Sequence, residues 1–136
     1  MKQLTDCSVY QTRKRAYKMR VLKFTSKLKK MFTYFEFDPC STWEDFDVLK
    51  KIFLEHFECE IVKELEAIYV KSCVFRRGKF VFELMYHDDY GNILLNQEKQ
   101  KKQYYLQLEQ LAHEVVNGVN ADKFDLKNIL PSTLSE

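Results

Sequence analysis

Residues 87–92, His-Asp-Asp-Tyr-Gly-Asn, hold the side chains of this chain that are best suited to chemistry. An imidazole and two carboxylates can bind a metal ion or transfer a proton. Adjacent residues at the end of a strand point to different sides, however, and a metal site needs several convergent ligands. The other two histidines, His56 and His113, fall in predicted helices with no second ligand at metal-binding spacing. We therefore predict neither a metal centre nor a cofactor.

Covalent catalysis is not indicated either. The chain has no Gly-x-Ser-x-Gly motif, no phosphate-cradling loop and no cysteine with an evident histidine partner. The sequence thus predicts a protein without enzymatic activity.

The same six residues are also typical of a tight turn between two strands. Aspartate side chains hold the backbone amides of a turn, and Gly91 accepts a positive φ. A turn does not need two adjacent acids, and Asp88 and Asp89 next to an aromatic Tyr90 also suit recognition of a basic partner. Both interpretations, a plain turn and a recognition loop, stay open here.

A helix and a strand precede this segment. The aromatic run at 31–37 predicts a strand that ends before Pro39, because proline lacks a backbone donor. Ser41 and Glu44 fit a capping box for a helix over about 42–57. The buried stripe of that helix is expected to contain Trp43, Phe46, Leu49, Phe53 and Phe57.

The pattern changes to a period of two after residue 58. Strands are predicted at 59–64, 67–75, 79–86 and 93–96, with Gly78 in a short hairpin loop. A second helix is predicted over about 97–117, and Gly118 is expected to end it in a left-handed conformation. The last residues suggest one more short helix, which Pro131 would end.

The first thirty residues are the hardest to interpret. Apolar residues recur at helical spacing from Tyr10 to Leu28, which favours a helix, although residues 19–24 could also form a strand. We expect a basic N-terminal arm at 1–30 and one domain at 31–136. The fold class is α+β: a single, mostly antiparallel sheet of four to five strands, packed by two main helices, with an additional N-terminal helical arm.

Charge is distributed unevenly along the chain. The net charge of +2 combines about +9 in residues 1–35, about −7 in residues 36–66 and zero in the remainder. Four separated cysteines without a Cys-x-x-Cys pair suit reduced thiols in a cytoplasmic protein. No apolar run approaches the roughly 20 residues of a membrane span.

A helix that opens with Trp43-Glu44-Asp45-Phe46, a meander, and then Asp88-Asp89-Tyr90-Gly91-Asn92 before a closing helix resembles small bacterial immunity proteins. The resemblance covers about residues 31–117. It implies a protein without enzymatic activity that binds one cognate toxin, often a nuclease, and blocks its active site. These proteins share no catalytic residues, so the resemblance assigns none to this chain. Antidotes to nucleases are often acidic overall, which this chain is not.

We therefore expect an immunity protein that places acids against a basic toxin surface. The residues expected to contact the partner are Glu44, Asp45, Asp47, Glu55, Glu58, Asp88, Asp89 and Tyr90. One alternative is a small nucleic-acid-binding protein that acts through the basic arm, since clustered cations favour phosphates. Another is a secretion chaperone that binds partner segments on exposed apolar surface.

Overall fold

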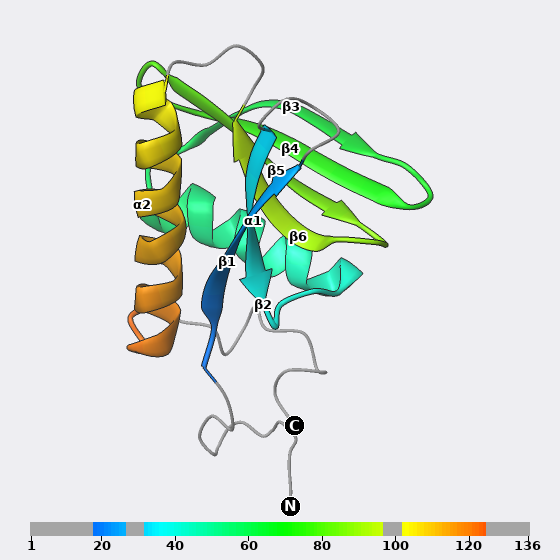
Figure 1. The fold of residues 1–136 in the computed structure, drawn as a ribbon, viewed down its shortest axis with the longest axis horizontal. Coiled ribbons are helices and arrows are strands. Elements are labelled where there is room, and N and C mark those ends of the chain that lie inside the picture. Colours follow the sequence, from blue (N-terminus) through cyan, green and yellow to red (C-terminus); the bar gives the residue numbers. More distant parts are fainter. Residues whose placement is uncertain (1–17, 27–31, 97–101, 125–136) are drawn as a thin grey trace, which may run out of the picture.

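The computed structural model describes residues 18–26, 32–96 and 102–124. The elements in chain order are β1 (Arg20–Ser26), β2 (Phe32–Asp38), α1 (Trp43–His56), β3 (Glu60–Glu66), β4 (Val70–Arg77), β5 (Phe80–His87), β6 (Gly91–Asn96) and α2 (Lys102–Asn120). The described strands form one six-stranded antiparallel sheet in the order β1-β2-β6-β5-β4-β3 (Figure 1). The α+β class is confirmed, with one strand more than expected.

Both helices pack on the same face of the sheet, here called the inner face. Helix α1 crosses β4, β5 and β6, and α2 lies along β6, β2 and β1. Alternate residues of β4 and β5 form much of this face: residues 71, 73 and 75 of β4 and residues 80, 82 and 84 of β5 are buried. No helix in the described part of the chain covers the opposite face, here called the outer face.

Phe53 of α1 lies at the centre of the core. It is fully buried, and its ring lies 5.4 Å from that of Phe75 on β4 and 5.6 Å from that of Phe82 on β5. A third ring, Phe37 of β2, lies 6.5 Å away. Phe46 and Leu49 are buried too, as predicted, whereas Trp43 is only partly buried. The packing of these aromatic rings determines the distance and orientation of α1 relative to the sheet.

The predicted N-terminal helix is wrong over residues 20–26, which form the edge strand β1. Met19 and Val21 join the core, Lys23 forms an ion pair with Glu109 of α2, and the residues between them face outward. This alternation has a period of two, and the neighbouring β2 supplies the backbone partners that a strand needs. The rest of the predicted arm, 1–17 and 27–30, lies outside the described residues.

Helix α2 continues through Gly118 to Asn120, so the predicted left-handed end at Gly118 is also wrong. Asp122 takes the left-handed conformation instead, with φ of 59°, and its amide donates to the Val119 carbonyl. Gly118 is needed for a different reason. A Cβ there would lie 2.4 Å from the Phe124 ring, so the glycine lets that ring close against the helix. The predicted short helix after it lies mostly outside the described residues.

Strand β3 is exposed along its whole length and forms the other edge of the sheet. Its hairpin with β4 extends to the right in Figure 1, away from α2. The register shifts between Ile61 and Lys63, and the strand carries four charged residues, Glu60, Lys63, Glu64 and Glu66. Bulges and charges on an edge strand oppose pairing with another chain.

Candidate partner-binding surface

The start of α1 is fixed by a capping box one residue later than predicted. Thr42 accepts a hydrogen bond from the Asp45 amide at 3.1 Å, and the Asp45 carboxylate accepts one from the Thr42 amide at 3.2 Å. Asp45 is fully buried, and its burial raises the pKa of its carboxyl, against the lowering effect of the Thr42 hydrogen bonds. Asp45 therefore holds the helix end and is removed from the predicted partner contacts.

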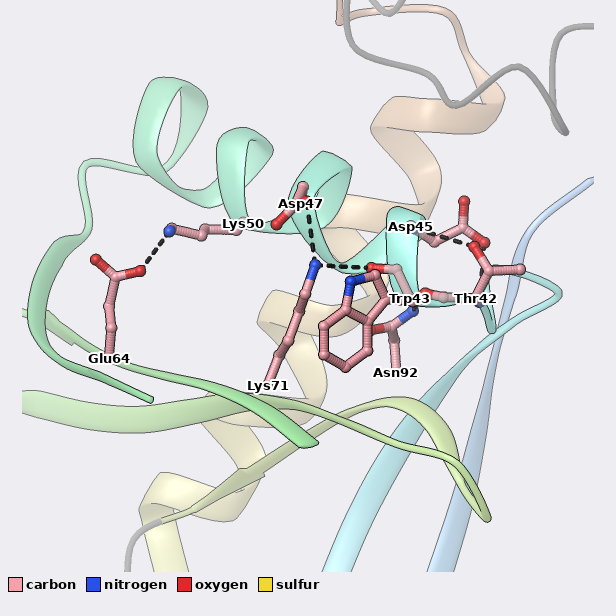
Figure 2. Close-up of polar contacts among 8 residues, drawn as sticks. All are labelled: Thr42, Trp43, Asp45, Asp47, Lys50, Glu64, Lys71 and Asn92. Atoms are coloured by element: carbon pink, nitrogen blue, oxygen red, sulfur yellow. Dashed lines mark hydrogen bonds and ion pairs between the residues drawn. The ribbon is translucent and has the colours of Figure 1, made fainter. Parts of the chain in front are cut away.

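Lys71 attaches the same helix end to the sheet. It stands on β4 with only 4% of its surface exposed, and its Nζ donates to the Trp43 carbonyl and to the Asp47 carboxylate, both at 3.2 Å (Figure 2). The same Nζ lies 4.3 Å from the centre of the Trp43 ring. Nearer the C-terminal end of α1, Lys50 forms a second ion pair with Glu64 of β3.

Asn92 connects β6 to the loop before α1. Its side-chain amide donates to the carbonyls of Cys40 and Thr42, at 2.9 and 3.0 Å, and the residue is fully buried. These contacts bring the first turn of α1 next to the loop between β5 and β6.

The segment at 87–92 forms a hairpin turn between β5 and β6, which confirms the turn interpretation. The Tyr90 amide donates to the His87 carbonyl at 3.0 Å, and the Asp89 amide donates to Nδ1 of His87 at 3.0 Å. Gly91 has φ of 74°, and a Cβ there would lie 3.0 Å from the Ser41 Cβ. The turn therefore leaves Asp88, Asp89 and Tyr90 exposed.

Tyr86 links this turn to the start of α1. Its ring meets the Trp43 ring edge-on, with 5.6 Å between centroids, and its hydroxyl donates to the Asp88 carboxylate at 3.1 Å. Partial burial raises the Tyr86 pKa, and the hydrogen bond and negative charge of Asp88 and the charge of Glu44 raise it further. The contact between the two rings therefore brings Glu44, which follows Trp43, near Asp88, which accepts from Tyr86.

The candidate surface contains most, but not all, of the predicted contact residues. Glu44, Asp47, Asp88, Asp89 and Tyr90 gather at the end of the sheet where α1 begins. Glu55 lies three turns further along α1, about 16 Å from Glu44 at ~1.5 Å of rise per residue, and forms an ion pair with Lys51 at 4.0 Å. Glu58 follows the C-terminal end of the helix, with φ of 56°. Glu55 and Glu58 therefore lie apart from the other predicted contact residues.

The prediction missed residues of β1 and β2 that adjoin the turn on the outer face. The Tyr34 ring lies 5.8 Å from that of Tyr90 and 5.4 Å from that of Phe24. An oxygen of the Glu36 carboxylate approaches Gly91, and burial, with the nearby charge of Asp38, raises the Glu36 pKa. The alternation of residues 32–37 places Tyr34 and Glu36 on one face, but the sequence does not show that β2 pairs with β6.

Other reactive groups of the described residues offer no site. Cys40, Cys59 and Cys73 are buried free thiols, and burial raises the pKa of Cys59 to about 11 and that of Cys73 to about 12. Such thiols stay protonated and react slowly. Among the described residues, no three His, Cys, Asp or Glu side chains gather as a metal site would require.

No helix in the described ranges is long and apolar enough to cross a membrane. Comparisons with family models, with curated proteins and with solved structures gave no match to this chain.

Proposed function

We propose that this protein is a non-enzymatic, cytoplasmic binding module, an immunity protein that neutralises a cognate bacterial toxin, a nuclease, by covering its active site. The proposal rests on one observation. The exposed acids Glu44 and Asp88 adjoin the Trp43 and Tyr86 rings, which contact each other. Asp47 is exposed one turn further along α1, and Asp89 and Tyr90 are exposed in the β5–β6 turn.

Aromatic rings and charged groups together are typical of binding hot spots. Large rings supply contact area at little cost in side-chain entropy, and the acids supply complementarity to a basic partner. A nuclease active site binds phosphates and is therefore basic, so carboxylates can occupy the positions of substrate phosphates. The rigid support of this surface favours the proposal further, since Lys71 of β4 and Asn92 of β6 both hold the start of α1 against the sheet.

The test is co-expression with a toxin encoded by the gene that adjoins its own. The protein should restore growth of cells that express this toxin, and Asp88→Lys with Asp89→Lys should abolish the protection. Glu66→Lys, on the exposed edge strand β3, is the matched control and should protect like the wild type. Absence of a neighbouring toxin, or full protection by the Asp88/Asp89 variant, would contradict the proposal.

A secretion chaperone is the second candidate, and the β3–β4 hairpin is the observation that favours it. Its apolar side chains are strongly exposed: Leu65 by 56%, Ile68 by 80% and Tyr69 by 63%. Exposed apolar patches mark interaction sites. If Ile68→Ser abolishes partner binding and the Asp88/Asp89 variant does not, the chaperone function is favoured.

A further inference from the structure

Three aromatic residues form a row across the outer face of the sheet: Phe24 on β1, Tyr34 on β2 and Tyr90 in the β5–β6 turn. Phe24 and Tyr34 are paired in register and stack with 5.4 Å between centroids and 23° between planes. Tyr34 and Tyr90 meet at 5.8 Å and 65°. We call these three residues the aromatic row.

The row does not belong to the core of the domain. Phe24 is 40% exposed and Tyr90 49% exposed, and both helices lie on the other face. Apolar side chains of β6 lie beside the row, since Ile93 and Leu95 are buried but are not members of the core cluster under the helices. Of these rings, that of Tyr90 is the most exposed, and its anchoring in a turn lowers the entropy cost of a contact with a partner.

Carboxylates gather at the Tyr90 end of the row. Asp88 and Asp89 precede Tyr90, and an oxygen of Glu36 lies 3.7 Å from the position that a Gly91 Cβ would occupy. Nearby basic groups already have acidic partners: Arg20 is paired with Asp38 at 2.7 Å, and Lys23 reaches Glu109 on the inner face at 3.6 Å. The His87 ring lies 5.3 Å from that of Tyr90, and its Nδ1 lies 3.9 Å from the Asp89 carboxylate, which leaves Asp88 and Glu36 as the other acids at this end of the row. The surroundings of Tyr90 are therefore complementary to a positive group.

We propose that the Tyr90 end of the aromatic row binds an arginine side chain from a basic segment of a protein partner. A guanidinium is planar, so it can stack on the Tyr90 ring and donate to a neighbouring carboxylate at the same time. This inference rests on the proposed function and extends its surface from the acids to the outer face. Nucleic acid fits the row less well, because Asp88, Asp89 and Glu36 would repel phosphates.

The probe is a fluorescein-labelled octapeptide of alternating arginine and glycine, titrated into the full-length protein at low salt and followed by fluorescence anisotropy. A peptide with lysine at each arginine position is the comparison. Tyr90→Ser should weaken binding of the arginine peptide about 2- to 5-fold, a typical cation–π contribution at an exposed site, and should affect the lysine peptide less.

Tyr90→Phe keeps the ring and should bind like the wild type. Tyr69→Ser removes an even more exposed tyrosine, far along the β3–β4 hairpin, and should also leave binding unchanged. An equal loss with Tyr69→Ser, or no loss with a folded Tyr90→Ser protein, would overturn the inference. Tighter, Tyr90-dependent binding of a single-stranded oligonucleotide would overturn it in favour of nucleic acid.

Two outcomes separate this inference from the proposed function. If Tyr90-dependent arginine binding is observed and no toxin is neutralised, the arginine site stands and the immunity function fails. If reversal of Asp88 and Asp89 abolishes protection while Tyr90→Ser leaves peptide binding unchanged, the immunity function stands and the arginine site fails. Stronger peptide binding after Arg13→Glu, Lys14→Glu and Arg15→Glu would assign the row to the chain's own N-terminal residues instead.

Discussion

The ammonium group of Lys71 lies 3.2 Å from the carbonyl oxygen of Trp43 and 4.3 Å from the centre of its indole ring. One buried cation on β4 thus contacts both the backbone and the side chain of the first residue of α1. This pair determines where the helix begins over the sheet, and the same contact positions the exposed acids Glu44 and Asp47.

Lys71→Ala should lower the free energy of unfolding by about 1–3 kcal/mol, because the partly buried Trp43 carbonyl loses the hydrogen bond from Lys71. Asp47→Ala should cost less than about 1 kcal/mol, since the Asp47 side chain is 67% exposed and solvent screens its ion pair with Lys71. Urea unfolding of both variants measures the two values. Equal losses would mean that the ion pair, not the carbonyl contact, is the main contribution of Lys71.

Gly118→Ala should destabilise the protein, although alanine favours a helix interior by about 1 kcal/mol over glycine. The cause is the Phe124 ring, which lies 2.4 Å from the position of the new Cβ. In a Phe124→Ala background the same substitution should become stabilising. Thermal or urea unfolding of the four proteins tests this change of sign, and its absence would show that the ring moves aside without cost.

Local patterns predicted most of the fold, and the errors come from tertiary contacts. The stripes of α1 and α2 and the two-residue period of β3 to β6 were sufficient to identify those elements. Residues 20–26 have a weak pattern, and only the pairing of β1 with β2 makes them a strand. Gly118 was expected to end α2, but its role depends on Phe124, whose contact no periodicity reveals.

The candidate surface was predicted in part for the same reason. Asp88, Asp89 and Tyr90 were identifiable, because a turn with two adjacent acids is unusual. The contribution of Glu44 depends on Tyr86 and Trp43 meeting across 43 residues of sequence, and that of Tyr34 depends on β2 pairing with β6. Asp45 was indistinguishable from its exposed neighbours, since a capping acid and a surface acid have the same side chain.

Phe53→Ala should cost about 3–5 kcal/mol, the usual range for removing a fully buried phenylalanine. The ring contacts three strands, so the cavity cannot collapse from one side alone. Leu54→Ala, at the next position and 37% exposed, is the control and should cost far less. A loss below about 1 kcal/mol for Phe53→Ala in urea melts would contradict the core assignment of α1.

The buried carboxyl of Asp45 should make stability depend on pH. Its folded-state pKa is raised above the usual 3.8, so the folded protein binds more protons than the unfolded chain between the two values. The unfolding free energy contributed by Asp45 therefore decreases as pH rises through that window. Asp45→Asn removes this titration, so the stability of the wild type relative to the variant should be greatest below the window and fall as pH rises. A difference that increases with pH would show that the Thr42 hydrogen bonds outweigh burial.

Neutralising Arg13, Lys14 and Arg15 with alanine should leave protection against the toxin unchanged, because the proposed contacts with the toxin are the acids of α1 and of the β5–β6 turn. The alternative, nucleic-acid binding through the basic N-terminal residues, predicts the opposite dependence. Each cation that contacts a duplex phosphate contributes about 0.9 to the slope of log affinity against log salt, so three lost contacts would flatten that slope markedly. Reversing Asp88 and Asp89 to lysine would then leave DNA binding intact or strengthen it, whereas it should abolish toxin binding.

Both variants and the wild type can be titrated with one duplex and with the toxin across the same salt series. Tight, salt-dependent binding of arbitrary DNA by the wild type, lost in the Arg13/Lys14/Arg15 variant, would replace the immunity function with a nucleic-acid one.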